Sequence, residues 1–310
     1  MGAEEILRKH GLSADGLQQS KSGFTNALFL TEDAVVKIFT EPGGAGFQKE
    51  SWFYGNIAPS YAPKLLGAGE DYLVLERIKG EGLFRAWRHM TDAKREDTVR
   101  CIAEINRELN RTALPEGMPL FDPCRNWGKK LLGRMETALG KLRLNQGVPE
   151  ELGRRAAEFI RANAGLLQEE ALFLVNPDLH FDNLIVAEDG KLFMIDFEML
   201  EAAPADYAVH VWNRMEIHPF NYANEEDDPL TLPEDYRFLM TWVRKYAPEL
   251  FAYPKSDVRI AMYSLVYELE LLCDFPKAVN PVERIGKYLE GACGYSAIYS
   301  QLGQPPKLLD

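Results

Sequence analysis

A predicted β-hairpin in the middle of the chain constrains the fold more than any other stretch. The apolar runs 184–186 and 192–195 flank the letters Glu-Asp-Gly-Lys, and an Asp-Gly pair between two such runs is a strong short-range hairpin signal. The hairpin places Asn183 and Asp196 near each other at its open end. Any fold for this chain must therefore bring two polar side chains together at that point.

The segment before the hairpin adds a third polar side chain. A further short strand is predicted at 171–175, and it delivers Asp178 on a loop a few residues before Asn183. Carboxylate and amide oxygens are hard ligands that suit Mg²⁺, which is usually held by one or two carboxylates together with substrate phosphates. The alternative is a surface hairpin that carries acidic and amide residues by chance, and the combined spacing argues against it.

At these residues the chain resembles the aminoglycoside phosphotransferase and choline kinase superfamily, the small-molecule relatives of protein kinases. The family's His-x-Asp-x-x-x-x-Asn loop and Ile-Asp-x-Glu/Asp motif are matched here by Asn-x-Asp-x-x-x-x-Asn from residue 176 and Ile-Asp-Phe-Glu from residue 195. The resemblance implies that Asp178 orients the acceptor hydroxyl and accepts its proton, while Asn183 and Asp196 hold Mg²⁺ on the phosphates. Asn176 departs from the pattern, because the family has a loop-supporting His there.

Short β-type runs dominate the N-terminal part of the chain. After a short helix predicted at 1–11, three strands of a meander are expected within 17–39, and two more at 63–69 and 72–78. These strands predict a five-stranded antiparallel lobe.

The first turn of this meander is small and polar. It contains Ser22, Gly23 and Thr25, and backbone amides in such a turn can approach phosphate oxygens closely. On composition alone an ordinary turn is the favoured interpretation. In the resembled family the hairpin that covers the nucleotide lies here, so the resemblance implies phosphate contacts, although this chain lacks a full Gly-x-Gly-x-x-Gly.

Lys37 and Glu50 form a candidate ion pair. Lys37 lies in the apolar run 35–39, where an inward amine needs an anionic partner to offset its desolvation, and an edge-strand lysine facing water is the equal alternative. Glu50 lies within the helical pattern 45–57, and the neighbouring Lys49 makes a solvated helix face the competing interpretation. By resemblance, a strand lysine followed by a helix glutamate matches the pair that positions the α- and β-phosphates in kinases.

The strand pattern breaks at Ile-Lys-Gly-Glu-Gly, after the fifth strand. By resemblance this is the hinge between lobes, where main-chain groups of Glu76, Arg77 and Ile78 bond the adenine edge. A plain interdomain linker is compatible with that role. The implied fold class is α+β, a bilobal protein-kinase-like fold. Its N-terminal nucleotide-binding lobe of five strands and one helix spans 1–80 with a hinge at about 76–80, and its mainly helical C-terminal lobe, 81–310, contains the catalytic hairpin.

Helical spacing dominates the remaining sequence. Thr91 is a suitable N-cap for a helix at 92–110. Further helices are predicted at 127–140, 150–169, 206–215, 233–246, 256–274 and 281–301. Asp206 resembles the Asp of a small family signature, Pro-x-x-Asp, which implies that it braces the catalytic loop.

The C-terminal part also holds candidate acceptor contacts. From its composition alone, the acidic run 225–228 is interpreted as an ordinary solvated loop. In the resembled family this region forms the acceptor cleft, where acidic groups would attract the ammonium groups of an acceptor. Aromatic side chains there either form core or pack on a sugar or quaternary amine, and these are Trp212, Tyr222, Tyr263 and Tyr267.

The composition excludes several classes of protein. A formal net charge of −12 argues against a general nucleic-acid binder and is compatible with a cationic acceptor. Apolar runs of membrane-spanning length and a basic secretory start are both missing, so we expect a cytoplasmic protein without a membrane partner. The four cysteines lie far apart, which favours free thiols over a disulfide framework or a zinc site: Cys101, Cys124, Cys273 and Cys293.

The expected function is a small-molecule kinase, acting as a monomer or homodimer. By resemblance it uses Mg²⁺ and moves the γ-phosphoryl group of ATP or GTP to a hydroxyl of an aminoglycoside-like or amino-alcohol acceptor. A choline-, ethanolamine- or homoserine-type metabolic kinase is the alternative among enzymes. A non-catalytic nucleotide-binding scaffold of the same fold is the alternative from another class, and Asn176 is its sequence support.

Overall fold

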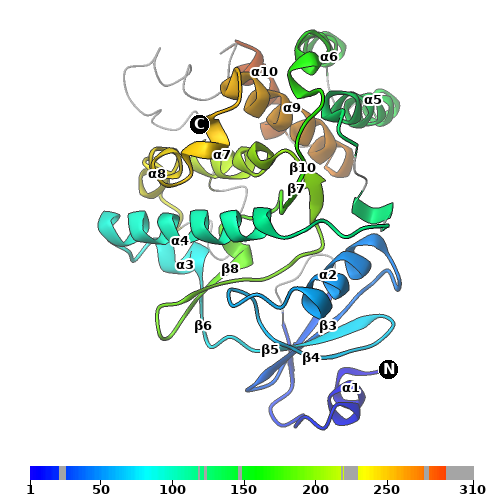
Figure 1. Ribbon diagram of the computed structural model, residues 1–310, viewed down its shortest axis with the longest axis vertical. Helices are drawn as coiled ribbons and strands as arrows, with labels where there is room; N and C mark the ends of the chain where they lie inside the picture. The colour runs from blue at the N-terminus through cyan, green and yellow to red at the C-terminus, as the bar shows by residue number, and fades with distance from the viewer. Residues whose placement is uncertain are drawn as a thin grey trace. The chain divides into compact units, whose positions relative to one another are not determined.

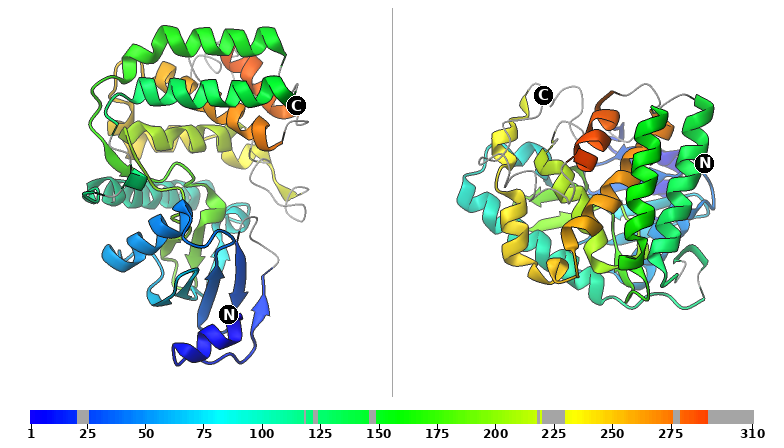
Figure 2. Two further views of the ribbon diagram at one scale, coloured as in Figure 1. Left: turned by 90° about the vertical axis from the view of Figure 1, so that its right-hand side faces the viewer. Right: turned by 90° about the horizontal axis from the view of Figure 1, so that it is seen from above.

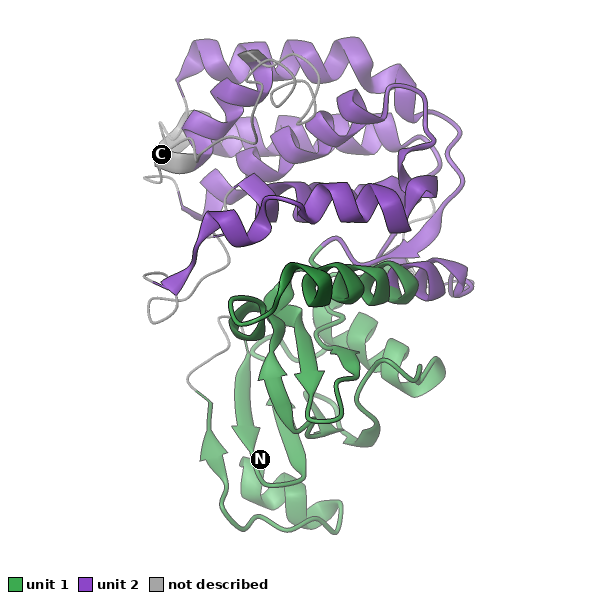
Figure 3. Cartoon of the chain, turned by 90° about the vertical axis from the view of Figure 1, so that its left-hand side faces the viewer, with its two compact units in different colours: residues 1–105, 118–120, 178–200 green, residues 106–117, 121–177, 201–310 purple. Residues whose placement is uncertain are grey.

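The chain packs as two compact units (Figure 3). In the computed structural model the described residues are 1–20, 26–117, 119–121, 124–145, 149–217, 219, 230–275 and 279–290. Unit 1 comprises residues 1–105, 118–120 and 178–200, and unit 2 comprises residues 106–117, 121–177 and 201–310. The segment 178–200 thus packs with the N-terminal strands, whereas the expected lobes assigned it to the C-terminal half. The lobe boundary near residue 80 stays a prediction.

Unit 1 contains the predicted five-stranded antiparallel sheet (Figure 1). Its strands are β1 (Gln18–Gln19), β2 (Ala27–Leu30), β3 (Ala34–Ile38), β4 (Leu65–Ala68) and β5 (Tyr72–Glu76). They are ordered β1-β2-β3-β5-β4, so β3 is a central strand. Lys37 is paired with Leu28 on one side and Leu73 on the other, and the edge-strand alternative for this lysine is therefore wrong.

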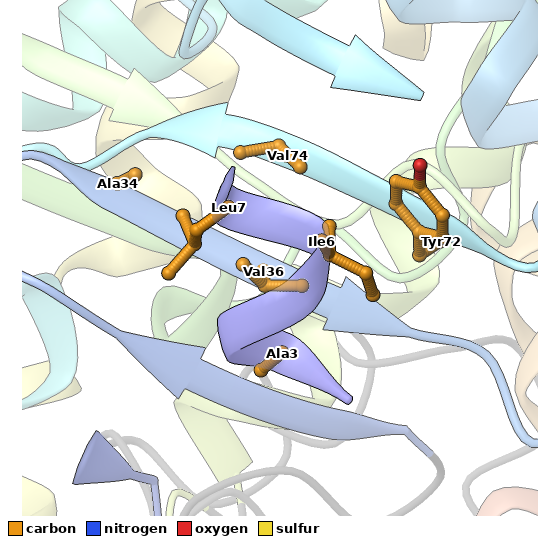
Figure 4. Close-up of a cluster of buried hydrophobic side chains, with 7 residues drawn as sticks. All are labelled: Ala3, Ile6, Leu7, Ala34, Val36, Tyr72 and Val74. Carbon is orange, nitrogen blue, oxygen red and sulfur yellow. The ribbon is translucent and has the colours of Figure 1, made fainter. Parts of the chain in front are cut away.

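Helix α1 (Ala3–Lys9) covers one face of this sheet. Its buried side chains are Ala3, Ile6 and Leu7, and they pack with Val36 of β3 and Val74 of β5 (Figure 4). The chain leaves the helix at Gly11, whose φ of +70° lies in the left-handed region that glycine enters at low cost. Because neighbouring side chains of a strand alternate between faces, Lys37 points to the face opposite α1.

The predicted catalytic hairpin is present in unit 1 and carries a third strand. Strands β8 (Leu184–Ala187) and β9 (Leu192–Met194) pair antiparallel, and β6 (Gly80–Gly82) pairs with the outer edge of β8. Sequence patterns did not predict β6, because Gly-Glu-Gly is a poor strand former. Gly80 is needed there, since a Cβ atom at this position would lie 2.2 Å from the carbonyl oxygen of Val186.

Two helices of unit 1 each follow one of its strands in the sequence. Helix α2 (Ala45–Asn56) follows β3, and α3 (Leu83–Trp87), which was not predicted, follows β6. Helix α4 (Asp92–Arg111) begins in unit 1 and ends in unit 2. Its predicted N-cap is observed, because the Lys94 amide donates to Thr91 Oγ1 at 3.3 Å.

Unit 2 is mainly helical. It contains α5 (Trp127–Asn145), α6 (Glu150–Asn163), α7 (Val209–Ile217), α8 (Leu239–Tyr246), α9 (Ser256–Asp274), α10 (Val279–Glu290) and the antiparallel strands β7 (Phe173–Val175) and β10 (Glu201–Ala203). Helix α9 packs against α5, α6, α7 and α10, and Figure 2 shows α5 and α6 in green beside α9 in orange. Most side chains of α9 itself are buried, so this helix forms the centre of the unit.

Several predicted helices in unit 2 have different bounds. The helix expected at 150–169 ends at Asn163 and continues as the 3₁₀ turn Ala164–Leu167. The helices expected at 206–215 and 233–246 each begin with a separate 3₁₀ turn, Ala205–Ala208 and Pro233–Tyr236. Tightened first turns are common at helix ends, and sequence periodicity does not distinguish them.

Two findings on the described residues concern membrane spans and cysteines. No helix among them combines the length and apolar character that crossing a bilayer requires. Cys101, Cys124 and Cys273 are free thiols, while Cys293 lies outside the described residues.

Candidate active site

Lys37 and Glu50 meet inside unit 1. The Lys37 side chain leaves the central strand β3 on the face opposite α1, and Glu50 comes from the middle of α2. The Lys37 ammonium lies 2.6 Å from Glu50 Oε2, and the two residues are 6% and 1% exposed. The structure thus brings the expected pair together, and the solvated-face interpretation of Glu50 is wrong.

Two further carboxylates surround the same ammonium. Lys37 Nζ lies 3.3 Å from Asp196 Oδ1 and 2.6 Å from Glu198 Oε1. One oxygen from each of Glu50, Asp196 and Glu198 lies within 4.8 Å of the others. Glu198 was not among the predicted site residues, although it ends the Ile-Asp-Phe-Glu motif that could have indicated it.

The segment after β9 is held in an unusual backbone conformation. Asp196 has a φ of +62°, a left-handed conformation that Asp and Asn adopt more readily than most residues. The next residue, Phe197, is buried and stacks on Phe53 of α2 with ring centroids 3.9 Å apart. This aromatic contact anchors the segment to α2, so the carboxylates on either side of Phe197 both reach Lys37.

The charges in this cluster shift one another's pKa values. Burial lowers the pKa of Lys37, but the carboxylates of Glu50, Asp196 and Glu198 together raise it above its ordinary value. Burial raises the pKa of Glu50 to about 7, against the opposing effect of Lys37. Burial likewise raises the pKa of Glu198. One ammonium cannot balance three carboxylates, so the cluster carries excess negative charge that a divalent cation would neutralise.

Asp178 and Asn183 are tied to each other and to the hairpin. The amide nitrogen of Asn183 donates to the backbone oxygen of Asp178 at 2.8 Å and to its Oδ2 at 3.3 Å. The backbone amide of Ile195 donates to the Asn183 carbonyl at 2.9 Å, which places Asn183 beside the residue that precedes Asp196. Since the Asn183 nitrogen makes these bonds, its oxygen is the atom that could coordinate a cation.

His180 lies in the same loop, between Asp178 and Asn183, and sequence reasoning missed it. Its Nε2 lies 3.6 Å from Asp178 Oδ2 and 3.3 Å from Asn183 Nδ2. Burial lowers the pKa of His180, but the carboxylates of Asp178, Asp182 and Asp196 together raise it above its ordinary value. Its position between Asp178 and Asn183 in the loop is the sequence signal that could have found it.

A cavity of about 290 Å³ opens beside the Lys37 cluster. Its apolar walls come mainly from the sheet and the hairpin, namely Leu28, Leu30, Val35, Leu75, Ile185 and Ile195. Its polar end is formed by Asn26, Lys37, Glu50 and Asp196. An apolar pocket with a few convergent polar groups is the usual form of a small-ligand site.

The predicted hinge residues also line this cavity, namely Glu76, Arg77 and Ile78. The amide of Glu76 donates to the Lys64 carbonyl at 2.8 Å, and that of Arg77 donates to the Asp33 carbonyl at 2.9 Å. Among the described residues, the Ile78 amide is the one of the three that donates to no backbone carbonyl. Of these three amides, it is the one that backbone hydrogen bonds among the described residues leave available.

The remaining expected site residues either lie outside the described residues or belong to unit 2. Ser22, Gly23, Thr25, Tyr222 and the run 225–228 lie outside the described residues. In unit 2, Trp212 and Tyr263 are core residues, and the Tyr267 ring packs against the Arg214 guanidinium at 4.0 Å. Asp206 binds Arg259 and Tyr263 within the same unit.

The fold is similar to those of solved small-molecule kinases. The structure of the gentamicin-APH(2")-IIa complex matches with a TM-score of 0.65 and 20% identity, covering 94% of this chain and 96% of that chain. Choline kinase from Cryptosporidium parvum Iowa II matches with a TM-score of 0.65 and 15% identity, covering 96% of each chain. A thermostable mutant of APH(4)-Ia, in a ternary complex with ADP and hygromycin B, matches at 0.66 and 16% identity, covering 95% of this chain and 100% of that chain.

These likenesses confirm the expected α+β kinase-like fold, and at such low identity they show the fold alone. None of the curated proteins matches the sequence significantly. The model of the phosphotransferase enzyme family matches residues 17–239, a span that holds Lys37, Glu50, Asp178, Asn183 and Asp196. Because the match covers well over half of the sequence, the chain belongs to the phosphotransferase enzyme family.

Proposed function

We propose that this protein transfers the γ-phosphoryl group of ATP or GTP to a hydroxyl group of a small molecule. The observation that carries the proposal is the Lys37 cluster at the polar end of an apolar cavity. The apolar walls suit a nucleotide base, with the Ile78 amide as its donor, and the charged end suits the phosphates. Membership of the phosphotransferase family supports the reaction class.

Lys37 and Glu50 act on the phosphates in this proposal. Glu50 is fully buried and fixes the ammonium in place, which leaves Lys37 free to exchange Asp196 and Glu198 for phosphate oxygens. A cation that is already oriented stabilises the charge of the transferring group without reorganisation. Ser22, Gly23 and Thr25, which lie between β1 and β2 in the sequence, are proposed to contact the phosphates.

The donor set also fits Mg²⁺. Asp196 and Glu198 supply carboxylate oxygens that lie close together, and Asn183 supplies an amide oxygen. Bound there, the ion would neutralise charge on the nucleotide's phosphates. Asp178 lies on the same loop as Asn183 and is proposed to orient the acceptor hydroxyl and accept its proton.

The acceptor is proposed to be an aminoglycoside-like molecule or an amino alcohol. Solved structures of similar fold include a gentamicin complex of an aminoglycoside phosphotransferase and a choline kinase. We place the reaction in the cytoplasm, with the protein a monomer or a homodimer. A metabolic kinase for choline, ethanolamine or homoserine would share the same donor site and differ in its acceptor contacts.

The test is nucleotide-dependent ADP or GDP release, measured with Mg²⁺ over a panel of aminoglycosides and amino alcohols. Wild-type protein should turn over at least one acceptor, and Asp196→Asn should lose Mg²⁺-dependent nucleotide affinity. Asn tolerates the left-handed backbone at this position, so this variant removes the charge alone. Asp189→Asn, at the exposed tip of the same hairpin, is the matched control.

Two results would overturn the proposal. Tight binding of Mg²⁺ and ATP without turnover of any acceptor or of water would make the protein a nucleotide-binding scaffold. Equal affinity of Asp196→Asn and wild type for the nucleotide with Mg²⁺ would remove Asp196 from the metal site.

A further inference from the structure

The Glu198 carboxylate lies where three elements of unit 1 meet. Asn26, just before β2, donates to Glu198 Oε1 through its side-chain amide, and Lys37 of β3 lies 2.6 Å from the same oxygen. Gly46, in the first turn of α2, faces the other oxygen, because a Cβ atom at this position would lie 2.8 Å from Glu198 Oε2. The carboxylate is thus bound on one side and closely approached by backbone on the other.

The Asn26 amide is itself fixed in orientation. Its Oδ1 accepts a hydrogen bond from the Thr40 backbone amide at 3.2 Å. Since the oxygen of the amide group is engaged there, the nitrogen is the atom that faces Glu198. The contact between Asn26 and Glu198 joins residues that are 172 positions apart in the sequence, so it is not a product of local chain geometry.

We propose that Asn26 is a positioning residue, which holds Glu198 beside Lys37 and Asp196 in a space that exists only because residue 46 is glycine. The inference rests on the proposed function, because Glu198 is one of the carboxylates that would bind the metal and its nucleotide. A carboxylate that is already oriented binds a cation without first losing side-chain freedom. Asn26 is therefore expected to act on the affinity for nucleotide with Mg²⁺, through Glu198.

A purely structural role for Asn26 makes a different prediction. In that case Asn26 would matter through its bond to the Thr40 amide, which orders the start of β2. Asn26→Asp separates the two roles, because Asp retains an oxygen for Thr40 but places a carboxylate against Glu198. Asn26→Ala removes both contacts.

The first experiment is calorimetric titration of these variants with ATP, in the presence and absence of Mg²⁺. Hydrogen bonds to charged groups are worth enough that both variants should lose about tenfold to about a hundredfold in affinity when Mg²⁺ is present. The loss should be at least as large for Asn26→Asp as for Asn26→Ala, and smaller without Mg²⁺. Wild-type affinity of Asn26→Asp, together with a defect in Asn26→Ala, would overturn the proposal in favour of the structural role.

The second experiment tests the pairing without any ligand. In the double variant Asn26→Asp/Glu198→Gln the amide and the carboxylate exchange places, so the hydrogen bond is restored with reversed polarity and the net charge is unchanged. Urea unfolding of the two single variants and the double variant forms a double-mutant cycle. We expect the double variant to be more stable than the sum of the single effects. Strict additivity would show that Asn26 and Glu198 do not interact and would overturn the proposal.

The third experiment uses the glycine. In Gly46→Ala the new methyl group would lie 2.8 Å from Oε2 of Glu198, at the far end of that side chain, and 3.3 Å from its Cβ, so we expect Glu198 to move while the fold is retained. Ala favours a helix interior over Gly, and Tm should stay equal or rise, while affinity for ATP with Mg²⁺ falls about tenfold, a loss of the size expected for a hydrogen bond to a charged group. Gly55→Ala is the matched control, since it lies in the same helix with open space around it and should leave affinity unchanged. Equal affinities of the two variants would contradict the proposal.

The proposed function and the proposed role of Asn26 can fail separately. If wild-type protein binds no nucleotide with Mg²⁺, the proposed function fails, whereas the ligand-free cycle still reports on the contact between Asn26 and Glu198. If wild-type binding is normal and the cycle is additive, the proposed function stands and the role of Asn26 is wrong.

Discussion

Each unit contains a buried cation bound by carboxylates, and the two clusters differ in how completely that cation is bonded. In unit 2 the Arg259 guanidinium donates to Asp206 at 2.6 and 2.9 Å, to Glu170 at 2.7 and 3.2 Å, and to the Leu166 carbonyl at 2.7 Å. All three of its nitrogens are therefore used. In unit 1 Lys37 is shared by three carboxylates beside a cavity.

The difference distinguishes a structural brace from a site. Asp206 is fully buried, and both of its carboxylate oxygens accept hydrogen bonds from Arg259. The Asp196 side chain is 38% exposed and lines the cavity, and its cluster has three carboxylates for one ammonium, whereas the Arg259 cluster has two carboxylates for one guanidinium. A buried ion pair alone is thus weak evidence for function, whereas excess charge next to a cavity is strong evidence.

The largest effect is expected at Asp178, which belongs to the same candidate site as the Lys37 cluster. Asp178→Asn keeps the size of the side chain but removes its basicity, so turnover of the identified acceptor should fall about 10² to 10⁴-fold, the usual contribution of a general base. Affinity for ATP with Mg²⁺ should change little, which calorimetry can check. Asp182→Asn, an exposed residue on the same loop, is the control and should keep full activity. An Asp178→Asn protein as active as wild type would sink the mechanism.

The next effect is on stability and concerns the Arg259 cluster of unit 2. Arg259→Met leaves Asp206 and Glu170 buried without their cation, so the free energy of unfolding should fall by about 3–5 kcal/mol. Urea unfolding measures this change. Arg154→Met removes an exposed arginine that also binds two carboxylates, Glu151 and Glu158, and should cost no more than about 1 kcal/mol. Equal costs for the two variants would show that the Arg259 cluster is not a brace.

Lys37→Met removes the cation of the Lys37 cluster, as Arg259→Met does for the Arg259 cluster. Loss of the ammonium should lower turnover about 10² to 10³-fold, as removal of one preorganised electrostatic group does. The melting temperature should fall less than for Arg259→Met, because burial already raises the pKa of Glu50 to about 7 and its carboxyl group can take up a proton. Lys64→Met, at an exposed lysine, is the control. A large drop in melting temperature with normal activity per folded molecule would make Lys37 structural.

The smallest effect is the pH dependence that Glu50 contributes to stability. Its pKa is raised from 4.5 to about 7 in the folded protein, so between these values the folded state holds a proton that the unfolded state has lost. The free energy of unfolding of wild type relative to Glu50→Gln should therefore fall as pH rises from about 4.5 to about 7, and then level off. Urea unfolding at several pH values measures this difference. A difference that grows with pH would mean that Lys37 lowers the pKa of Glu50 instead.

Local sequence patterns predicted the parts of the site that depend on local structure. The Asp-Gly turn between two apolar runs was enough to predict the hairpin, and hence the approach of Asn183 to the start of the metal motif. The apolar strand and the helix that carry Lys37 and Glu50 were also predicted from local pattern, but their pairing was predicted from the resemblance to kinases. In each case the residues lie on elements that periodicity or turn chemistry specifies.

Contacts between distant segments were not predictable in this way. Strand β6 forms because Gly80 can approach the Val186 carbonyl, and nothing in Gly-Glu-Gly itself indicates a partner. The contact of Asn26 with Glu198 joins segments at opposite ends of unit 1's sequence. Arg259 likewise reaches Asp206 and Glu170 from a helix whose pattern shows only that it is amphipathic. These features depend on tertiary packing, which overrides local preference.

The discontinuity of unit 1 has a consequence for the order in which the protein is made. Lys37 and Glu50 are only 13 residues apart, whereas Lys37 and Asp196 are separated by 159. At a synthesis rate of about 5–20 residues per second, the ribosome adds Asp196 on the order of ten to thirty seconds after Lys37. During this interval the nascent sheet can form around an ion pair of zero net charge. The two other carboxylates arrive with the later segment, so any folding of residues 1–105 during this interval proceeds without the repulsion among the three carboxylates.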